Sequence, residues 1–378
     1  MILRQEYQER IRTALSRNPI AMLVGARQVG KSTLARQIVT DGPVTYFDLE
    51  DPATVALLEQ PLLALGGLRG LVVIDEAQRA SQLFPVLRVL ADRVEAPTKF
   101  LLLGSASPEL RRQSNESLAG RVEVIDVTGF STREVGVSEQ DRLWLRGNFP
   151  RSFLATSEEN SVSWREQFTR TFVERDLRLL GFGFTPAAMG RFWTMLAHYH
   201  GQLWNASEVA GAMGLSPKTV NRYLDALEQT FMVRRLQPWF ANVGKRIVKS
   251  PKIYLRDTGI LHWQHRIRDM RDLLHHPKLG ASWEGFVIEE LLGRLRSAEA
   301  YFYNVHSGTE LDLFLLHNGR RIGVEIKRHD APRMTRGMHV ALEDLKLDHL
   351  WVVYPGTRRY ALSSNTEVLP FSELVCIE

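Results

Sequence analysis

The feature that most constrains the fold is a glycine-rich turn between a strand-like segment and a helix-like segment. Residues 20–24 form a short apolar run, as in a buried strand, and residues 32–39 have the apolar spacing of an amphipathic helix. Between them, residues 25–32 read GARQVGKS, which fits the pattern G-x-x-x-x-G-K-S of a phosphate-binding loop. Because this loop requires a strand before it and a helix after it, the sequence predicts a nucleotide-binding α/β domain.

Five positions in the loop and at the start of its helix have separate expected tasks. Gly25 and Gly30 allow backbone N–H groups to turn toward the phosphates, and Lys31 is placed to reach the β- and γ-phosphates. Ser32 is expected to ligate Mg²⁺, and Thr33 follows it as a further cofactor-binding residue. ATP and Mg²⁺ are therefore the expected cofactors.

A second acidic motif completes the expected nucleotide site. Residues 71–74 are continuously apolar, which is typical of a strand buried on both faces, and Asp75 and Glu76 follow directly. Asp75 is expected to hold the Mg²⁺ shell, and Glu76 to act as the base for the attacking water. This acidic pair argues against the alternative that the glycine-rich turn only changes the direction of the chain.

Two more residues are candidates for catalysis at this site. Ser105 ends the apolar run 99–105 and is expected to contact the γ-phosphate, the alternative being a plain strand-end cap. Arg121 precedes a further strand and is expected to act as a finger on a neighbouring subunit's nucleotide, the alternative being a solvated side chain. Arg111 and Arg112 are weaker candidates for the same role. A finger acting between subunits implies a homo-oligomer.

Positive charge is concentrated in the middle of the chain. The net charge is +5, but residues 1–140 hold 16 basic and 17 acidic side chains, and residues 271–378 hold 13 and 15. Residues 141–270 hold 19 basic side chains against 11 acidic ones. A basic field of this kind indicates an anionic partner, most commonly a nucleic acid.

Within this basic region, one stretch reads as a helix–turn–helix. Residues 207–213 form a short helix, Gly214 supplies the turn, and residues 217–227 carry an apolar stripe at helical spacing. Lys218 and Arg222 fall on the outward side of the second helix, where they can contact DNA.

The following segment, residues 230–256, is rich in basic and aromatic side chains and contains no acidic residue. Its seven basic residues are Arg234, Arg235, Lys245, Arg246, Lys249, Lys252 and Arg256. We expect a β-wing whose Lys245, Arg246 and Lys249 contact phosphates without reading base sequence. The alternative is a winged helix that serves only packing or oligomerisation.

The last third suggests a nuclease-like site. Glu284 lies near the start of a predicted helix, Asp312 lies in a strand, and Glu325 and Lys327 alternate onto one face of the next strand. Asp312 and Glu325 can meet across the strand pair and suit Mg²⁺, Glu284 can complete the metal shell, and Lys327 can orient water. The alternative is a degenerate scaffold that was kept for binding DNA or for packing.

The order of these motifs resembles a widespread prokaryotic family. The phosphate-binding loop, LVVIDEAQR, LLLGSAS, SLAGRVEV, the helix–turn–helix stretch and GTELDLF followed by VEIK occur in this order over nearly all 378 residues. Members of that family are AAA-type P-loop ATPases with a C-terminal domain of restriction-endonuclease-like, PD-(D/E)XK, fold. The resemblance implies ATP and Mg²⁺ at the loop and at Asp75 and Glu76, a nuclease-like constellation at Asp312, Glu325 and Lys327, and DNA as a partner.

We therefore expect an α/β protein in four parts. These are an AAA-type P-loop ATPase domain over 1–140, a helical lid or linker over 141–190, a winged-helix DNA-binding domain over 191–265, and a nuclease-like α/β domain over 266–378.

The location of the protein follows from its cysteine content and from its apolar segments. Cys376 is the single cysteine, so an intramolecular disulfide and a cysteine-ligated zinc site are excluded. No apolar run reaches the length of a membrane helix, and the first 17 residues mix acidic and basic side chains unlike a signal peptide. A cytoplasmic protein without a membrane partner is expected.

Two functions remain open at this point. The first is a DNA-acting ATPase, a motor or remodeller of branched or broken DNA in repair or recombination, with a possible metal-dependent nuclease domain. The second is an ATP-switched DNA-binding regulator or scaffold whose nuclease-like domain is inert. DNA-stimulated ATP turnover favours the first, and slow turnover that is indifferent to DNA favours the second.

Overall fold

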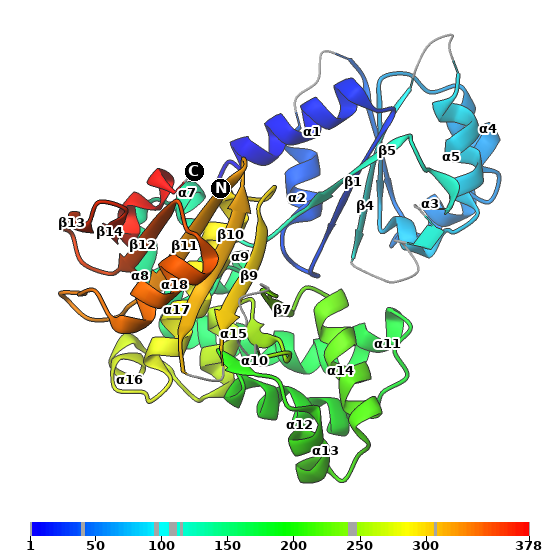
Figure 1. Ribbon diagram of the computed structural model, residues 1–378. Coiled ribbons are helices and arrows are strands. Elements are labelled where there is room, and N and C mark those ends of the chain that lie inside the picture. The colour runs from blue at the N-terminus through cyan, green and yellow to red at the C-terminus, as the bar shows by residue number, and fades with distance from the viewer. Residues whose placement is uncertain are drawn as a thin grey trace. The chain divides into compact units, whose positions relative to one another are not determined.

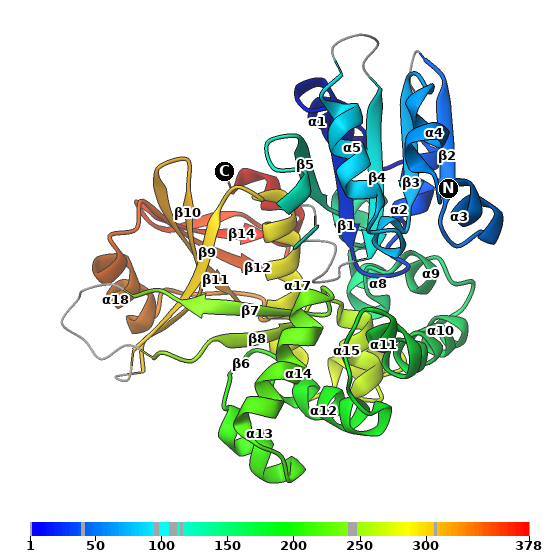
Figure 2. The same ribbon diagram turned by 90° about the vertical axis from the view of Figure 1, so that its right-hand side faces the viewer.

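The computed structural model describes residues 2–38, 42–93, 98–105, 112–113, 116–240, 248–305 and 308–377. The chain forms two compact units (Figures 1 and 2). Unit 1 comprises Met1–Phe130, Arg175–Gly183 and Gln229–Phe231, and unit 2 comprises Ser131–Glu174, Phe184–Glu228 and Met232–Glu378. Because the chain passes between the units more than once, neither unit is one continuous stretch of sequence.

Unit 1 is built on a five-stranded parallel sheet with the order β2-β3-β4-β1-β5 (Figure 2). The strands are β1 (Ile20–Gly25), β2 (Val44–Asp48), β3 (Leu71–Asp75), β4 (Lys99–Ser105) and β5 (Val122–Asp126). The three inner strands are buried almost throughout, whereas both edge strands are partly exposed. This burial explains the unbroken apolar runs of the inner strands. The predicted α/β core with a parallel sheet is confirmed.

Short helices cover this sheet. In the described residues they are α1 (Gln5–Arg17), α2 (Lys31–Arg36), α3 (Pro52–Leu57), α4 (Pro61–Gly66), α5 (Leu83–Ala91) and the 3₁₀ turn η1 (Ala77–Arg79). Leu83, Phe84 and Leu87 of α5 join a buried cluster with Val72 and Leu102 of the sheet. This packing fixes β3 and β4, whose carboxyl ends carry the predicted site residues.

The helices of unit 2 surround its sheet and connect it to unit 1 along the chain. They are α7 (Thr132–Val135), α8 (Gln140–Arg146), α9 (Pro150–Phe153), α10 (Glu158–Thr171), α12 (Pro186–His198), α13 (Ala206–Met213), α14 (Pro217–Gln229), α15 (Thr258–Gln264), α16 (Met270–Leu274), α17 (Leu279–Arg294) and α18 (Arg336–Leu345), with the 3₁₀ turns η2 (Val137–Glu139) and η4 (Phe371–Cys376). The π-helical turn η3 (Phe172–Asp176) and α11 (Leu177–Leu179) lie where the chain passes from unit 2 into unit 1.

Unit 2 contains a nine-stranded mixed sheet with the order β13-β14-β12-β11-β10-β9-β7-β8-β6 (Figure 2). Its strands are β6 (Gln202–Leu203), β7 (Val233–Pro238), β8 (Lys252–Leu255), β9 (Glu299–Asn304), β10 (Glu310–His317), β11 (Arg320–Ile326), β12 (His349–Tyr354), β13 (Tyr360–Ser363) and β14 (Thr366–Pro370). Strand β7 pairs in parallel with β9, at Gln237 with Tyr301 and at Pro238 with Phe302. One sheet therefore runs through the parts expected as separate domains at 191–265 and 266–378, which the sequence divides only by motif.

The helix–turn–helix stretch has both of its expected helices, α13 and α14. Gly214 ends α13 in the left-handed region, with φ 66°, a conformation that glycine adopts without strain. Val220, Leu224 and Leu227 are buried along α14, as their spacing predicts. Strands β7 and β8 follow as an antiparallel pair, with β6 beside β8. The tip of the expected wing, with Lys245 and Arg246, lies outside the described residues.

Within the described residues, no helix is both long and apolar enough to cross a membrane.

Candidate functional site

Three of the predicted residues meet at one edge of the unit 1 sheet. Strand β1 ends at Gly25 and pairs there with Ser105, the last residue of β4. Strand β3 lies on the other side of β4 and ends at Asp75. Because parallel strands present their carboxyl ends at the same edge, the glycine-rich loop, Ser105 and Asp75 face one region of space. This edge is where open α/β sheets bind ligands.

The glycine-rich loop is shaped around the ammonium group of Lys31. Gly30 has φ 95° and Gln28 has φ 61°, so the backbone turns through the left-handed region twice. A Cβ on Gly25 would lie 2.3 Å from the carbonyl oxygen of Val127, so only glycine fits there. The Lys31 Nζ donates to the carbonyl oxygens of Gly25 at 3.1 Å and Ala26 at 2.8 Å.

Asp75 and Glu76 are each held by a residue that the sequence did not single out. Asp75 is buried, its Oδ1 accepts the Glu76 N–H at 3.0 Å, and its Oδ2 accepts the hydroxyl of Tyr46. Glu76 lies in the left-handed region with φ 55°, and its Oε2 accepts a bond from the side-chain amide of Gln78. A non-glycine residue in this region is costly, and such strain is commonly found at functional sites.

The charges at this edge influence one another. Burial lowers the pKa of Lys31 to about 8, although the carboxylates of Glu76 and Asp75 oppose the shift. Burial also raises the pKa of Glu76, and Lys31 offsets part of that rise. A carboxylate with a raised pKa is a stronger base, which suits the predicted role of Glu76 in activating water.

The remaining side chains at this edge fit a nucleotide and its metal ion. Ser105 is 1% exposed, and its hydroxyl has no hydrogen-bond partner among the described residues. A buried polar atom without a partner is costly, and a bound phosphate oxygen would satisfy it. Ser32 is half-buried, whereas Thr33 is exposed. A buried lysine, an unpaired hydroxyl and adjacent carboxylates are the groups that ATP and Mg²⁺ require, with Ser32 and Asp75 available for the metal.

Arg121 does not join this edge in its own chain. It precedes β5, whose first residue Val122 pairs with Ile20 at the start of β1, so Arg121 lies at the amino edge of the sheet. Its Nε and Nη2 donate to the two carboxylate oxygens of Asp92, at 2.6 and 2.8 Å. A role toward a neighbouring subunit stays a prediction. Of its two expected rivals, Arg112 pairs with Glu116 at 3.5 Å, and Arg111 lies outside the described residues.

The loop also has an anchor from a distant part of the chain. Arg27, within the glycine-rich loop, forms an ion pair with Asp176 at the end of the π-helical turn η3. Their side chains are 14% and 3% exposed, and Glu50 lies 3.7 Å from Arg27 on its more open side. The two residues are 149 positions apart, so no local pattern could have shown the contact. Residues 175–183 belong to unit 1, although the sequence placed them in a helical linker.

A second charged cluster lies in unit 2 and contains the predicted nuclease residues. Glu284 of α17 and Asp312 of β10 both face the ammonium group of Lys252 from β8, at 3.1 and 3.9 Å. Glu310 forms a further ion pair with Lys252. Glu325 binds Lys327 at 2.5 Å. Sequence reasoning brought the carboxylates together but missed Lys252, which is 32 positions from Glu284.

This second cluster does not fit the predicted metal site. Burial lowers the pKa of Lys252, but the carboxylates around it raise that pKa above its ordinary value, so the group carries a positive charge. The Asp312 Oδ2 accepts the N–H of Ile326 at 2.8 Å, and Glu284 accepts the hydroxyl of Tyr254. In the part of the chain that the structure describes, no three His, Cys, Asp or Glu side chains form a group that could hold a metal ion. The metal roles expected for Glu284, Asp312 and Glu325 stay predictions, and Lys252 lies beside Glu284 and Asp312.

The contacts of the basic side chains in residues 230–256 also differ from those expected from the sequence. Arg234 and Arg256 both bind Glu289, each with one contact at 3.0 Å. Arg235 pairs with Asp225 and Glu228 of α14, and Lys252 with the carboxylates described above. Four of the seven basic side chains therefore face acidic partners from outside the run. Of the residues expected at the wing, Lys249 is exposed, as are Lys218 and Arg222 of α14.

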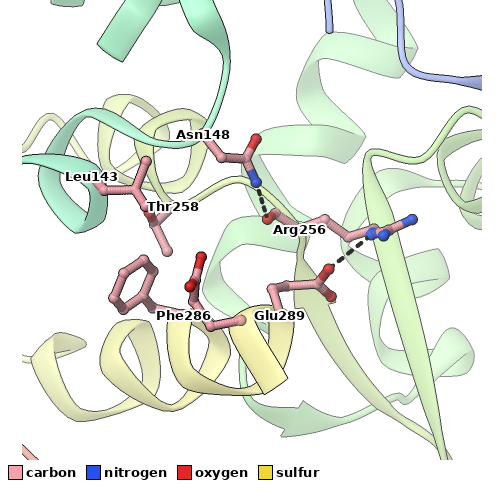
Figure 3. A pocket seen from close by; sticks show the side chains of 7 residues that line it. Leu143, Asn148, Arg256, Thr258, Phe286 and Glu289 are labelled. Carbon is pink, nitrogen blue, oxygen red and sulfur yellow. Dashed lines mark hydrogen bonds and ion pairs between the residues drawn. The ribbon is translucent and has the colours of Figure 1, made fainter. Parts of the chain in front are cut away.

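The pocket in Figure 3 lies beside one of these ion pairs. Its lining includes Asn148, Arg256, Phe286, Glu289 and Glu290, and the Arg256–Glu289 pair closes one side. Burial works to raise the pKa of Glu289, but the two facing guanidinium groups lower it to about 2. A carboxylate neutralised in this way stabilises the contact between β8 and α17 and is not available as a catalytic base.

Comparisons with known protein families match three successive segments of the chain. The AAA domain family matches residues 17–136, and two domains of unknown function, DUF8612 and DUF4143, match residues 137–271 and 279–374. The chain is 49% identical over 375 residues to the uncharacterized protein Rv2008c of Mycobacterium tuberculosis, which covers 99% of this chain and 85% of that protein. The same values hold for the uncharacterized protein Mb2031c of Mycobacterium bovis. The Walker-type ATPase PABY2304 of Pyrococcus abyssi is 15% identical, with a TM-score of 0.48 over 70% of this chain and 96% of that chain.

The parallel sheet, the glycine-rich loop and the AAA domain match show that residues 17–136 form an AAA-type P-loop ATPase domain. The chain belongs to the same family as Rv2008c and Mb2031c.

Proposed function

We propose that this protein hydrolyses ATP at the carboxyl edge of the unit 1 sheet and couples the nucleotide cycle to DNA. The observation that carries the first half is the convergence of Lys31, Asp75, Glu76 and Ser105 at that edge. Lys31, Asp75 and Ser105 are buried, and Glu76 is half-buried. Lys31, Asp75 and Glu76 form hydrogen bonds with neighbouring groups, whereas the hydroxyl of Ser105 has no hydrogen-bond partner among the described residues.

The residues divide the work of hydrolysis between them. Lys31 and the N–H groups of the loop hold the β- and γ-phosphates, and Ser105 donates its unpaired hydroxyl to the γ-phosphate. Glu76 accepts the proton of the attacking water, and Gln78 keeps its carboxylate in place. A Mg²⁺ ion held by Ser32 and Asp75 would neutralise charge that develops on the phosphates.

The DNA half of the proposal is supported by the order and exposure of elements in unit 2. Helix α12, strand β6, helices α13 and α14, and strands β7 and β8 follow one another as in a winged helix. Lys218 and Arg222 of α14 and Lys249 before β8 are exposed, which suits contact with phosphates. Because four residues of the basic run are paired internally, we assign the DNA contact to these three cations and to Lys245 and Arg246.

A homo-oligomer is part of the proposal. Arg121 lies at the amino edge of its own sheet, so it can serve only the nucleotide of another subunit. To do so, it would have to leave Asp92, which now binds it at two points. On assembly, the ion pair between Arg121 and Asp92 would therefore be replaced by a contact between Arg121 and the nucleotide of the neighbouring subunit.

A second candidate function is the ATP-switched DNA-binding regulator with an inert C-terminal domain. Lys252 favours it over a DNA-cutting enzyme, because its ammonium group pairs with Glu284 and Asp312, two of the carboxylates expected to hold the nuclease metal ion. The two candidates share ATP binding and DNA binding. They differ in whether DNA changes the rate of hydrolysis.

The test measures ATP turnover and DNA binding with linear, forked and four-way-junction duplexes. Turnover that rises with DNA, and falls back when Lys218 and Arg222 are both replaced by alanine, supports the proposal. DNA binding that depends on nucleotide while turnover ignores DNA would favour the regulator. Absence of DNA binding in every nucleotide state would overturn the DNA half and leave the ATPase half standing.

A further inference from the structure

We propose that Lys252 is a built-in cation that takes the position of a divalent metal ion among the carboxylates of unit 2. The Lys252 cluster, as we use the term, consists of Lys252, Tyr254, Glu284, Glu310 and Asp312. In this arrangement the site excludes metal ions as long as the lysine is present, and removing the lysine creates a metal site. The inference goes beyond the proposed ATPase function, which concerns unit 1.

The position of the ammonium group is the first argument. Lys252 reaches Glu284 at 3.1 Å and Asp312 at 3.9 Å, and it also pairs with Glu310. Its side chain is 4% exposed, so the charge is enclosed by protein and not by water. An ammonium group is a compact point charge with three donors; Lys252 donates to Glu284 and Glu310 and attracts Asp312 as an ion pair at 3.9 Å. A divalent cation bound by the same oxygens would need the same space.

The electrostatic balance is the second argument. The three carboxylates repel one another, and Glu284 and Asp312, whose side chains are 17% and 13% exposed, are unfavourable to bury without a cation, whereas Glu310 is 42% exposed. In this fold Lys252 supplies the compensating charge for Glu284, Asp312 and Glu310, and Lys327 supplies it separately for Glu325. By formal charge, Lys252 and Lys327 offset two of the four carboxylates Glu284, Glu310, Asp312 and Glu325.

The occupied carboxylate oxygens are the third argument. Asp312 already accepts the N–H of Ile326 at 2.8 Å, and Glu284 already accepts the hydroxyl of Tyr254. Tyr254 stands two residues after Lys252 on the same strand, so β8 places both groups on one face. The Oε1 of Glu284 accepts from both Lys252 and Tyr254, and outside the cluster the buried Oε2 of Glu325 has no hydrogen-bond partner among the described residues.

Lys252 lies on a different element from the carboxylates that it binds, so the cluster connects separate elements of unit 2. Lys252 and Tyr254 come from β8, which pairs with β7 beside the helix–turn–helix stretch, whereas Glu284 comes from α17 and Asp312 from β10. The ion pairs therefore tie β8 to two elements of the nuclease-like part. A metal ion bound only by the carboxylates would leave β8 without this connection.

Mn²⁺ binding to the full-length, nucleotide-free chain tests the proposal, with free Mn²⁺ followed by electron paramagnetic resonance. Lys252→Met is expected to bind one more Mn²⁺ per chain than wild type, and Lys252→Met combined with Asp312→Asn is expected to lose that additional ion. Lys346→Met removes a positive charge from an exposed lysine elsewhere in unit 2 and is expected to bind the same number of Mn²⁺ ions as wild type. A folded Lys252→Met variant without the additional ion would overturn the proposal.

A comparison of wild type with Asp312→Asn tests the proposal even if Lys252→Met fails to fold. Wild type and Asp312→Asn are expected to bind the same number of Mn²⁺ ions, because Asp312 holds a lysine and not a metal. If wild type binds an ion that Asp312→Asn loses, Lys252 does not fill the metal position and the proposal is wrong. Circular dichroism and tryptophan fluorescence establish that each variant is folded.

Discussion

Replacing Asp176 by alanine is expected to destabilise unit 1 selectively. The carboxylate of Asp176 is 3% exposed and forms an ion pair with Arg27, whose side chain is 14% exposed. Removing one partner of a buried ion pair typically costs about 3–5 kcal/mol, because the other charge is left uncompensated. Glu50 lies 3.7 Å from Arg27 and can compensate in part, so we expect the lower end, about 3 kcal/mol in the free energy of unfolding.

The distribution of tryptophan makes this effect measurable unit by unit. All eight tryptophans of the sequence lie in unit 2, so tryptophan fluorescence reports on the unfolding of unit 2 alone. Far-ultraviolet circular dichroism reports on both units. At about 3 °C per kcal/mol, the circular dichroism transition of unit 1 should move down by roughly 9 °C while the fluorescence transition stays in place.

A matched control separates the ion pair from a general effect of mutation in this segment. Arg178 is exposed and lies two positions after Asp176, and its replacement by alanine should change the stability of unit 1 by less than about 0.5 kcal/mol. Nucleotide affinity should fall in Asp176→Ala, because the loop loses an anchor at Arg27. Equal stability of Asp176→Ala and Arg178→Ala would show that the pair does not hold the loop.

Three further predictions concern the nucleotide and DNA sites. Lys31→Ala should abolish binding of a fluorescent ATP analogue, and unchanged affinity would overturn the assignment of the phosphate loop. Because burial raises the pKa of Glu76, ATP turnover should fall as pH drops through that raised pKa, by about tenfold per pH unit below it. A turnover that stays level down to the pH range of an ordinary carboxyl group would contradict this role. Replacing Lys218, Arg222 and Lys249 together by alanine should weaken DNA binding and flatten the plot of log affinity against log salt by up to about 2.7; an unchanged slope would mean that these cations do not meet phosphates.

The nucleotide site could be predicted well because its signals are local. The spacing of Gly25, Gly30 and Lys31 specifies a loop, and unbroken apolar runs specify buried parallel strands whose carboxyl ends share an edge. Asp75 and Ser105 could therefore be placed at that edge without knowledge of the strand order.

The partners of these residues could not be predicted, because they depend on strand order and on long-range packing. Tyr46 reaches Asp75 only because β2 lies next to β3, and nothing in the sequence near Tyr46 indicates this. The contact between Arg27 and Asp176 requires a segment of the expected linker to return to unit 1.

Charge counts along the chain were the least reliable guide. Residues 230–256 contain no acidic side chain, yet Arg234 and Arg256 are neutralised by Glu289 from α17. A run of like charges in a sequence shows only that any oppositely charged residues that bind it come from other parts of the chain. The same reasoning explains Lys252, which is one of the basic residues of this run and which the fold places among carboxylates.

The measurement that tests the central claim most directly is phosphate release from ATP by the full-length protein, comparing wild type with Glu76→Gln. The account predicts Mg²⁺-dependent release by wild type and a loss of about 100-fold or more in Glu76→Gln, with ATP binding retained. Retained binding would show that Lys31 and the loop are intact and that only the base is missing. Equal rates of release from the two proteins would contradict the account and would place the catalytic base elsewhere.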